Sequence, residues 1–152
     1  METGSEHLAE LNMIKAFNPK SIAPPTGTGT YSHGVVVPPN SRLLYIAGQV
    51  GIRPDGSIGD SIEEQSETVW ANLVAVLAEA GMGIKDIVKI NNYLTRAENM
   101  AAFRVVRTKY LGGHCPASTI MVVQALAYPK FLVEVEAVAA KAVPVAPPPN
   151  AP

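Results

Sequence analysis

The sequence has little charge, a single cysteine and no long apolar run, and each shortage excludes a class of protein. Charged residues make up 16% of the chain, the formal net charge is −1, and no basic stripe marks a surface for nucleic acid. The one cysteine, Cys115, excludes an intrachain disulfide framework and a multi-cysteine metal site, and it fits a reducing, cytoplasmic compartment. No apolar run approaches the ~18 residues of a membrane span, and the acidic start is unlike a secretory signal, so we expect no membrane partner.

The chain does contain enough apolar material for one core. Hydrophobic residues account for 47% of its 152 positions, which suits a single domain. The low charge also suggests that partner subunits cover part of the surface. We expect a flexible start over residues 1–12, one domain over residues 13–141, and a disordered tail over residues 142–152, whose prolines cannot donate to a sheet.

Hydrophobic periodicity and turn residues predict six strands and two helices. Ser61 and Glu64 form a capping-box pattern before the first helix, and Gly81 fits its end. Residues 38–41 predict a hairpin, and the short link 127–130 predicts an antiparallel last pair of strands. The predicted strands cover residues 13–17, 33–37, 42–47, 87–94, 118–126 and 131–141, and the helices cover residues 62–80 and 98–111. This order predicts an α+β fold: one mixed six-stranded sheet with both helices on one face.

Two carboxylates lie in the apolar run from Phe131 to Ala139. Because strand side chains alternate faces, Glu134 and Glu136 share one face, about 7 Å apart, and the opposite face is wholly apolar and must meet a core. The carboxylate face is either the solvent-facing side of an antiparallel strand or a functional surface. If it were left open to water it would also expose apolar neighbours, so we expect another subunit to cover it.

Five stretches, taken together, match the pattern of a known family. They are Tyr31-Ser32-His33-Gly34, Tyr45–Val50, Asn72-Leu73, Pro116-Ala117-Ser118-Thr119 and Val133–Ala139. In this order and spacing they resemble the Rid family (YjgF-like reactive intermediate deaminases, also labelled endoribonuclease L-PSP). The resemblance implies a chorismate-mutase-like fold and a homotrimer, with a central barrel built from three sheets and active sites between subunits. It also implies hydrolysis of reactive enamines and imines, which releases ammonia and a 2-oxo acid without a metal or an organic cofactor.

The resemblance also suggests site residues. Glu134 matches the family's glutamate that positions or activates water, Tyr31 matches a tyrosine that lines the pocket, and backbone groups near Gly48 could contact the substrate. Ser118 stands where the family has an arginine that binds the substrate carboxylate, and it carries neither charge nor a bidentate fork. We expect Ser118 to line the pocket. The chain therefore resembles the arginine-lacking branches of the family, which predicts weak hydrolysis of 2-imino acids.

Other side chains with chemical potential have simpler interpretations. Arg104 and Arg107 belong to the predicted second helix, so no other arginine lies near Ser118 in the sequence. His33 has no neighbouring ligands and makes no zinc site. Cys115 follows His114 directly, and because adjacent side chains seldom face each other, we interpret it as a loop thiol.

The sequence leaves three functions open. The first is a cytoplasmic, cofactor-free, homotrimeric hydrolase or deaminase that acts on enamines, imines or related small molecules. The second is a non-catalytic ligand-binding or protein-interaction trimer, which Ser118 favours and the retained Glu134 opposes. The third is the family's label of endoribonuclease, which the net charge of −1 opposes because neutralised phosphates dominate affinity for RNA.

Overall fold

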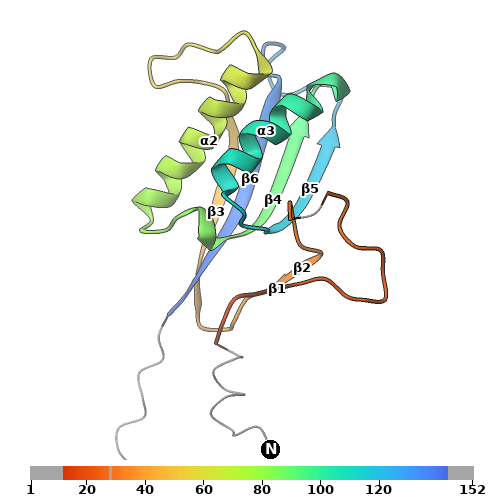
Figure 1. Cartoon of the computed structure of the whole chain (residues 1–152). Coiled ribbons are helices and arrows are strands. Elements are labelled where there is room, and N and C mark those ends of the chain that lie inside the picture. The colour runs from red at the N-terminus through yellow and green to blue at the C-terminus, as the bar shows by residue number, and fades with distance from the viewer. Residues whose placement is uncertain (1–11, 28, 144–152) are drawn as a thin grey trace, which may run out of the picture.

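The computed structural model describes residues 12–27 and 29–143, so the expected flexible start and most of the expected tail lie outside the described residues. Helix α2 (Ile62–Glu79) begins where the sequence predicts (Figure 1). The Ser61 hydroxyl accepts a hydrogen bond from the backbone N–H of Glu64, and the Glu64 carboxylate accepts one from the N–H of Ser61, each at 3.2 Å. This confirms the capping box. Gly81 ends the helix with a left-handed φ of 67°.

The second long helix, α3 (Met100–Leu111), packs across α2. Two single 3₁₀ turns, η1 (Ile84–Asp86) and η2 (Ala97–Asn99), lead into the strand and the helix that follow them. Gly112, with a φ of 55°, ends α3. The rings of Trp70 on α2 and Tyr110 on α3 stack with centroids 5.8 Å apart, which fixes the two helices against each other.

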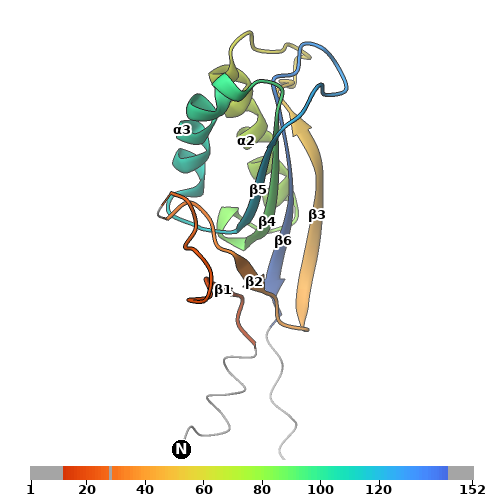
Figure 2. The same ribbon diagram turned by 90° about the vertical axis from the view of Figure 1, so that its right-hand side faces the viewer.

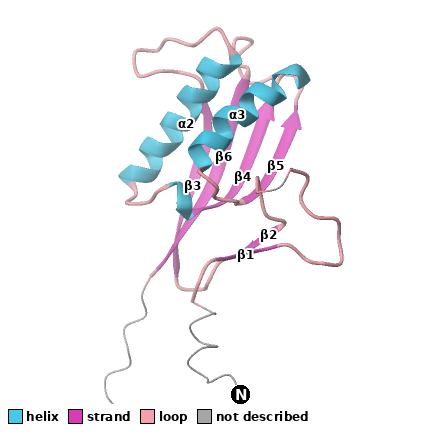
Figure 3. Cartoon of the chain, viewed as in Figure 1, coloured by secondary structure: helices cyan, strands magenta, loops and turns pink. Residues whose placement is uncertain are grey.

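The described part of the chain contains six strands, but they form two sheets rather than the single sheet expected. The four-stranded sheet has the order β3-β6-β4-β5, and its strands are β3 (Ser41–Val50), β6 (Val133–Ala142), β4 (Ile87–Leu94) and β5 (Ala117–Val122). The two-stranded sheet pairs β1 (Lys15–Phe17) with β2 (Gly34–Val36). Figure 3 shows this small sheet as a separate layer beside one end of the large sheet.

The predicted hairpin over residues 38–41 is wrong, because β2 pairs with β1 and not with β3. Pro38 and Pro39 interrupt the chain between β2 and β3 with two residues that lack an N–H donor, so no ladder continues through them. The small sheet instead approaches the start of β5, where the N–H of Ser32 donates to the carbonyl of Pro116 at 3.1 Å. This contact brings the loop before β2 close to β5.

The predicted antiparallel pairing of the last two strands is also wrong. The α3 crossover places β5 parallel to β4, as helical crossovers do, and β5 becomes an edge strand. The link after β5 then carries the chain past the end of β4, where the N–H of Thr95 donates to the carbonyl of Leu132 at 3.1 Å. As a result β6 enters the sheet between β3 and β4, antiparallel to both.

Both helices lie on one face of the four-stranded sheet, as the sequence predicts, and no described element covers the other face (Figure 2). The alternation expected for β6 is confirmed from Val133 to Ala139, where buried side chains under the helices alternate with half-buried ones on the open face; the next residue, Ala140, is buried as well. The core between sheet and helices contains Val69, Trp70, Leu73, Leu77, Ile90, Leu94, Phe103, Val133, Val135 and Ala139. The face that carries Glu134 is therefore the one without a cover.

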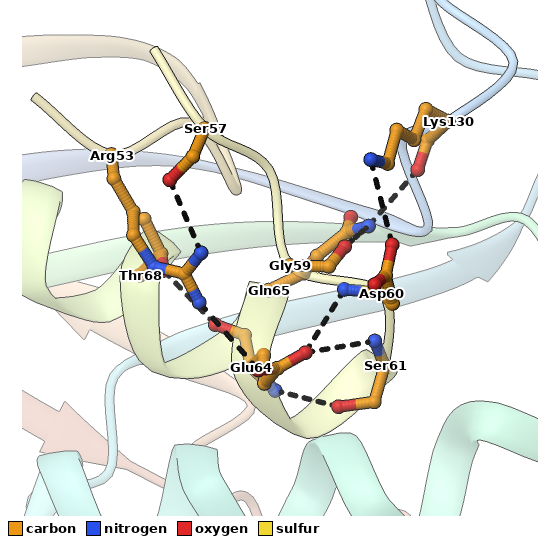
Figure 4. A network of polar contacts seen from close by, with 9 residues as sticks. All are labelled: Arg53, Ser57, Gly59, Asp60, Ser61, Glu64, Gln65, Thr68 and Lys130. Atoms are coloured by element: carbon orange, nitrogen blue, oxygen red, sulfur yellow. Dashed lines mark hydrogen bonds and ion pairs between the residues drawn. The ribbon is translucent and has the colours of Figure 1, made fainter. Parts of the chain in front are cut away.

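A buried glutamine on α2 fixes the segment that leads into β6 (Figure 4). The Gln65 amide nitrogen donates to the carbonyls of Gly59 at 2.8 Å and Lys130 at 2.9 Å. Its amide oxygen accepts the N–H of Leu132 at 2.9 Å. Because Gln65 is 1% exposed and uses both ends of its amide, it sets the entry of β6 and with it the position of Glu134 two residues later.

Candidate functional site

A cavity of about 360 Å³ lies beside the edge strand β5, on the helix-covered side of the sheet. The loop before β2 and the helix α3 form its other walls. Tyr31 and Ser118, two of the residues selected from the sequence, both line it, together with Arg104 and Arg107. A cavity of this size suits a small molecule.

Tyr31 is held at the cavity by contacts of its own loop. Its hydroxyl oxygen accepts the backbone N–H of Thr26 at 3.2 Å, and its ring meets the ring of His33 edge-on, with centroids 6.1 Å apart. The next residue, Ser32, is buried and donates its hydroxyl to the carbonyl of Cys115 at 2.7 Å. These contacts attach the loop to the start of β5, so Tyr31 faces the strand that carries Ser118.

Ser118 lies on the helix-facing side of β5, next to a buried asparagine. The side-chain amide of Asn92 donates to the Ser118 hydroxyl at 3.2 Å and to the carbonyl of Thr119 at 2.7 Å. No described histidine forms a hydrogen bond with the Ser118 hydroxyl: His114 contacts the carbonyl of Ile87 at 2.7 Å, and the His33 ring lies against Tyr31. Ser118 therefore has the surroundings of a pocket-lining hydroxyl rather than of an activated nucleophile.

Arg104 and Arg107 line the cavity, although their distance from Ser118 along the chain had suggested that they would not contribute to the site. Arg107 is buried, and its Nη2 donates to the carbonyl of Thr30 at 2.8 Å. Burial, followed by the nearby charge of Arg104, lowers the pKa of Arg107. A signal was present in the sequence: Arg107 follows Phe103 and Val106 on the apolar face of α3, and a charge on such a face requires an explanation.

Glu134 lies on the opposite, open face of the sheet, against Gly48 of β3. The register of β3 against β6 shifts between Ile46 and Gln49, and this irregularity brings the Gly48 backbone next to the carboxylate. A Cβ atom at position 48 would overlap Oε1 of Glu134. Among the described residues, no donor forms a hydrogen bond with the Glu134 carboxylate.

Glu136, two residues further on, has a different environment. One of its carboxylate oxygens accepts the Asn91 amide at 2.8 Å and the Tyr93 hydroxyl at 2.9 Å. The hydrogen bond to Glu136, burial and the charges of Glu136 and Glu134 raise the pKa of Tyr93. Together with Tyr45, Glu136 and Asn91 also line a hollow of about 430 Å³ on the open face. Glu136 thus has fixed hydrogen-bond partners, whereas Glu134 has none among the described residues.

The four residues selected from the sequence therefore form two pairs. Tyr31 and Ser118 share the cavity on the helix side of β5, and Gly48 and Glu134 meet on the open face. Within residues 12–27 and 29–143, no group of His, Cys, Asp or Glu side chains could hold a metal ion. None of the helices in this part of the chain is long and apolar enough to cross a membrane.

Comparison with known proteins gives one consistent result. The sequence profile of the family described as Endoribonuclease L-PSP matches residues 21–141. A RutC family protein from Pyrococcus abyssi is 37% identical over 121 residues, which cover 77% of this chain and 91% of that protein. The mitochondrial protein MMF1 of Saccharomyces cerevisiae is 32% identical, over 69% of this chain and 70% of its own length.

Solved structures agree with the sequence relatives. The Rid family protein YyfB from Yersinia pestis superposes with a TM-score of 0.74 at 33% identity, over 84% of this chain and 98% of that one. RidA from an Antarctic Psychrobacter gives a TM-score of 0.61 at 32% identity, over 76% and 92%. The predicted α+β, chorismate-mutase-like fold is therefore confirmed. The chain belongs to the Rid (YjgF-like) family, whose sequence profile carries the description Endoribonuclease L-PSP.

Proposed function

We propose that the protein is a small-molecule hydrolase or deaminase that acts on enamines, imines or related reactive metabolites, without a cofactor. The observation that carries the proposal is the environment of Glu134: its carboxylate lies on the open sheet face against Gly48, and no described residue donates a hydrogen bond to it. The neighbouring Glu136 shows by contrast how a carboxylate on this strand is satisfied when its role is to hold the sheet. Membership of the Rid family supports the same chemistry.

The chemistry needs only water and a general base. In the proposed reaction, Glu134 removes a proton from water, and the oxygen attacks the carbon of the C=N bond to give a carbinolamine. The proton held by Glu134 passes to the nitrogen, which completes the carbinolamine. Glu134 then transfers the proton of the new hydroxyl group to the nitrogen as the C–N bond breaks, and a carbonyl compound and ammonia leave. An enamine first takes a proton on carbon to become the imine. Tyr31 and Ser118 would shape the pocket, and backbone groups near Gly48 would position the substrate.

The proposed site requires a homotrimer, because one chain places its two pairs of residues on opposite faces of the sheet. The open face supports assembly with further copies of the chain: Leu43, Tyr45 and Met121 are exposed there, and Tyr45 is 75% exposed. Large apolar side chains exposed on an otherwise uncovered sheet face are typical of an interface. In the proposed trimer, the open face of one subunit brings Glu134 to the cavity of the next.

Sedimentation of the full chain should give the mass of three 16.1 kDa subunits at micromolar concentration. Tyr45→Glu should convert it to a monomer, because a carboxylate would be buried next to apolar partners. Tyr128→Glu is the matched control, since Tyr128 is 65% exposed in the link between β5 and β6, and it should leave the trimer intact. A wild-type chain that sediments as a monomer would refute both the trimer and the intersubunit site.

A second candidate is a non-catalytic, ligand-binding or protein-interaction trimer. The specific observation in its favour is Ser118, which stands where the family pattern has its carboxylate-binding arginine. The two candidates differ in one measurable property, which is turnover.

The test is a screen of enamines, imines and small amides with ammonia release as the measurement. At least one compound of the panel should lose ammonia faster with the protein than in buffer. The 2-imino acids that an amino-acid oxidase generates in situ should be accelerated only weakly, because Ser118 lacks the charge that binds their carboxylate. Absence of any acceleration across the panel would leave the non-catalytic trimer as the better proposal. The cytoplasmic location expected from the sequence also stays a prediction, and the relative MMF1 is a mitochondrial protein.

A further inference from the structure

The cavity beside β5 contains a buried positive charge that the proposed chemistry does not use. Arg107 is 6% exposed and reaches the cavity from α3, where it lines the same space as Tyr31 and Ser118. Only its Nη2 has a hydrogen-bond partner among the described residues, the carbonyl of Thr30. Its Nε is buried with no described partner. No described carboxylate forms an ion pair with it.

A buried guanidinium without a charged partner destabilises the folded protein. It stays protonated at every physiological pH, even though burial and Arg104 lower its pKa. A buried charge is normally paired, because an uncompensated one has lost its hydration without gaining a partner. A purely structural role, holding the loop through Thr30, would leave most of the donors of Arg107 unused. The unpaired donors and the adjoining cavity together indicate that an anion binds there.

We propose that Arg107 is the anion-binding residue of this cavity, and that it supplies from α3 the charge that the family pattern carries at the position of Ser118. The short side chain of Ser118 leaves space beside β5, and the cavity of about 360 Å³ fits a small carboxylate rather than an oligonucleotide. Because Nε is buried, the terminal Nη groups are the donors left for a ligand, and together they form a planar pair that a carboxylate can accept. The assignment of Arg107 rests on the proposed function, in which Glu134 acts on the imine or enamine group of the same substrate.

This inference replaces the expectation, drawn from the missing charge at Ser118, that 2-imino acids are poor substrates. Arg104 also lines the cavity, but it is exposed, so water screens its charge. The two arginines stand one helical turn apart on α3 and therefore form a matched pair. They share charge, chemistry and cavity, and they differ in burial.

The test measures binding of 2-oxobutanoate and of its uncharged counterpart butan-2-one to the full chain in its native assembly. Wild type should bind the acid at least tenfold more tightly than the ketone, because a charge-assisted contact contributes about that much or more. Arg107→Gln should weaken binding of the acid about ten- to hundredfold and leave the ketone unchanged. Arg104→Gln, the matched control, should change the affinity for the acid less than threefold.

Two further measurements separate an anion-binding role from a structural one. Ser118→Arg in the Arg107→Gln background should restore binding of the acid, since it returns the charge to the strand. In wild type, the Nε–H resonance of Arg107, assigned by its loss in Arg107→Lys, should shift with the acid and not with the ketone. The second measurement needs no stable Arg107→Gln protein.

The inference is overturned if Arg107→Gln binds the acid as wild type does, if Arg104→Gln is the more damaging change, or if wild type does not prefer the acid. The proposed hydrolase fails separately. If the acid binds through Arg107 but no imine or enamine releases ammonia, the anion site stands and the protein is a ligand-binding trimer. If ammonia is released equally by wild type and Arg107→Gln at low substrate concentration, the hydrolase stands and the anion site does not.

Discussion

Glutamine in place of Glu134 should abolish turnover of whatever substrate the screen identifies. The amide keeps the volume of the carboxylate but cannot accept a proton from water. Loss of a general base typically lowers the rate by about 10²–10⁴-fold. Because no described donor binds this carboxylate, its removal should leave the fold intact, and thermal unfolding should occur at the wild-type temperature or slightly above it. Rates of ammonia release, measured beside the melting curves, check both parts.

Glu136→Gln is the control for this substitution, and it should behave in the opposite way. Both hydrogen bonds, from Asn91 and Tyr93, end on one oxygen of Glu136, and a glutamine amide oxygen can accept them without the charge that strengthens them, so stability should fall moderately and activity little. If Glu136→Gln proves the more damaging to turnover, the assignment of Glu134 as the base is wrong. Full activity in Glu134→Gln would favour the non-catalytic trimer.

Alanine in place of Gly48 should disable the site without touching a charged group. The added Cβ would overlap Oε1 of Glu134, and the flexible carboxylate is the group that must move. A displacement of about 1 Å in a reacting group can lower a rate by about 10²-fold. We expect a loss of that order in ammonia release, with a small change in the free energy of unfolding.

The matched control is Gly83→Ala, because a Cβ at Gly83 meets no atom within 4 Å. It should leave rate and stability unchanged. In a Glu134→Gln background, Gly48→Ala should cause no further loss of rate, since the base is already absent. An active Gly48→Ala enzyme would mean that Glu134 does not have to hold the position seen here.

Local signals in the sequence predict the helices well. The capping box of Ser61 and Glu64, the glycine after each helix and the apolar stripe on α2 are all short-range features, and each is present in the structure. The alternation along β6 is equally local, and it correctly separates the core face from the face of Glu134. Such features depend only on neighbours in the chain.

Strand pairing could not be predicted in the same way, because it depends on partners far apart in the sequence. The short link 127–130 suggested that β5 and β6 are neighbours, but the α3 crossover had already placed β5 parallel to β4. The prolines after β2 suggested a turn, whereas they separate two sheets. In each case one local signal was compatible with two arrangements, and tertiary contacts decided between them.

The candidate site also contains residues that local motifs identify and residues that only the tertiary structure identifies. Residues that share a motif with a known family, such as Glu134 and Tyr31, could be selected from the sequence as candidates. The apolar face of α3 marks Arg107 as an unusual charge, but that it lines the same cavity as Ser118 depends on how the helix packs against the sheet. Distance along the chain is a poor guide to a cavity whose walls come from a loop, a helix and a strand.

The central place of β6 has a consequence for synthesis of the protein. β3 has no partner in the large sheet other than β6, so the sheet stays divided until residues 133–142 join it. During translation, the ribosome releases β3, α2 and β4 before β6. Until β6 is released, the edges of β3 and β4 that pair with it stay unpaired, and the apolar face of the sheet is only half covered. Pairing of such distant segments is slow and exposes the nascent chain to aggregation. We therefore expect the nascent chain to be most prone to aggregation in the interval before its last strand is released.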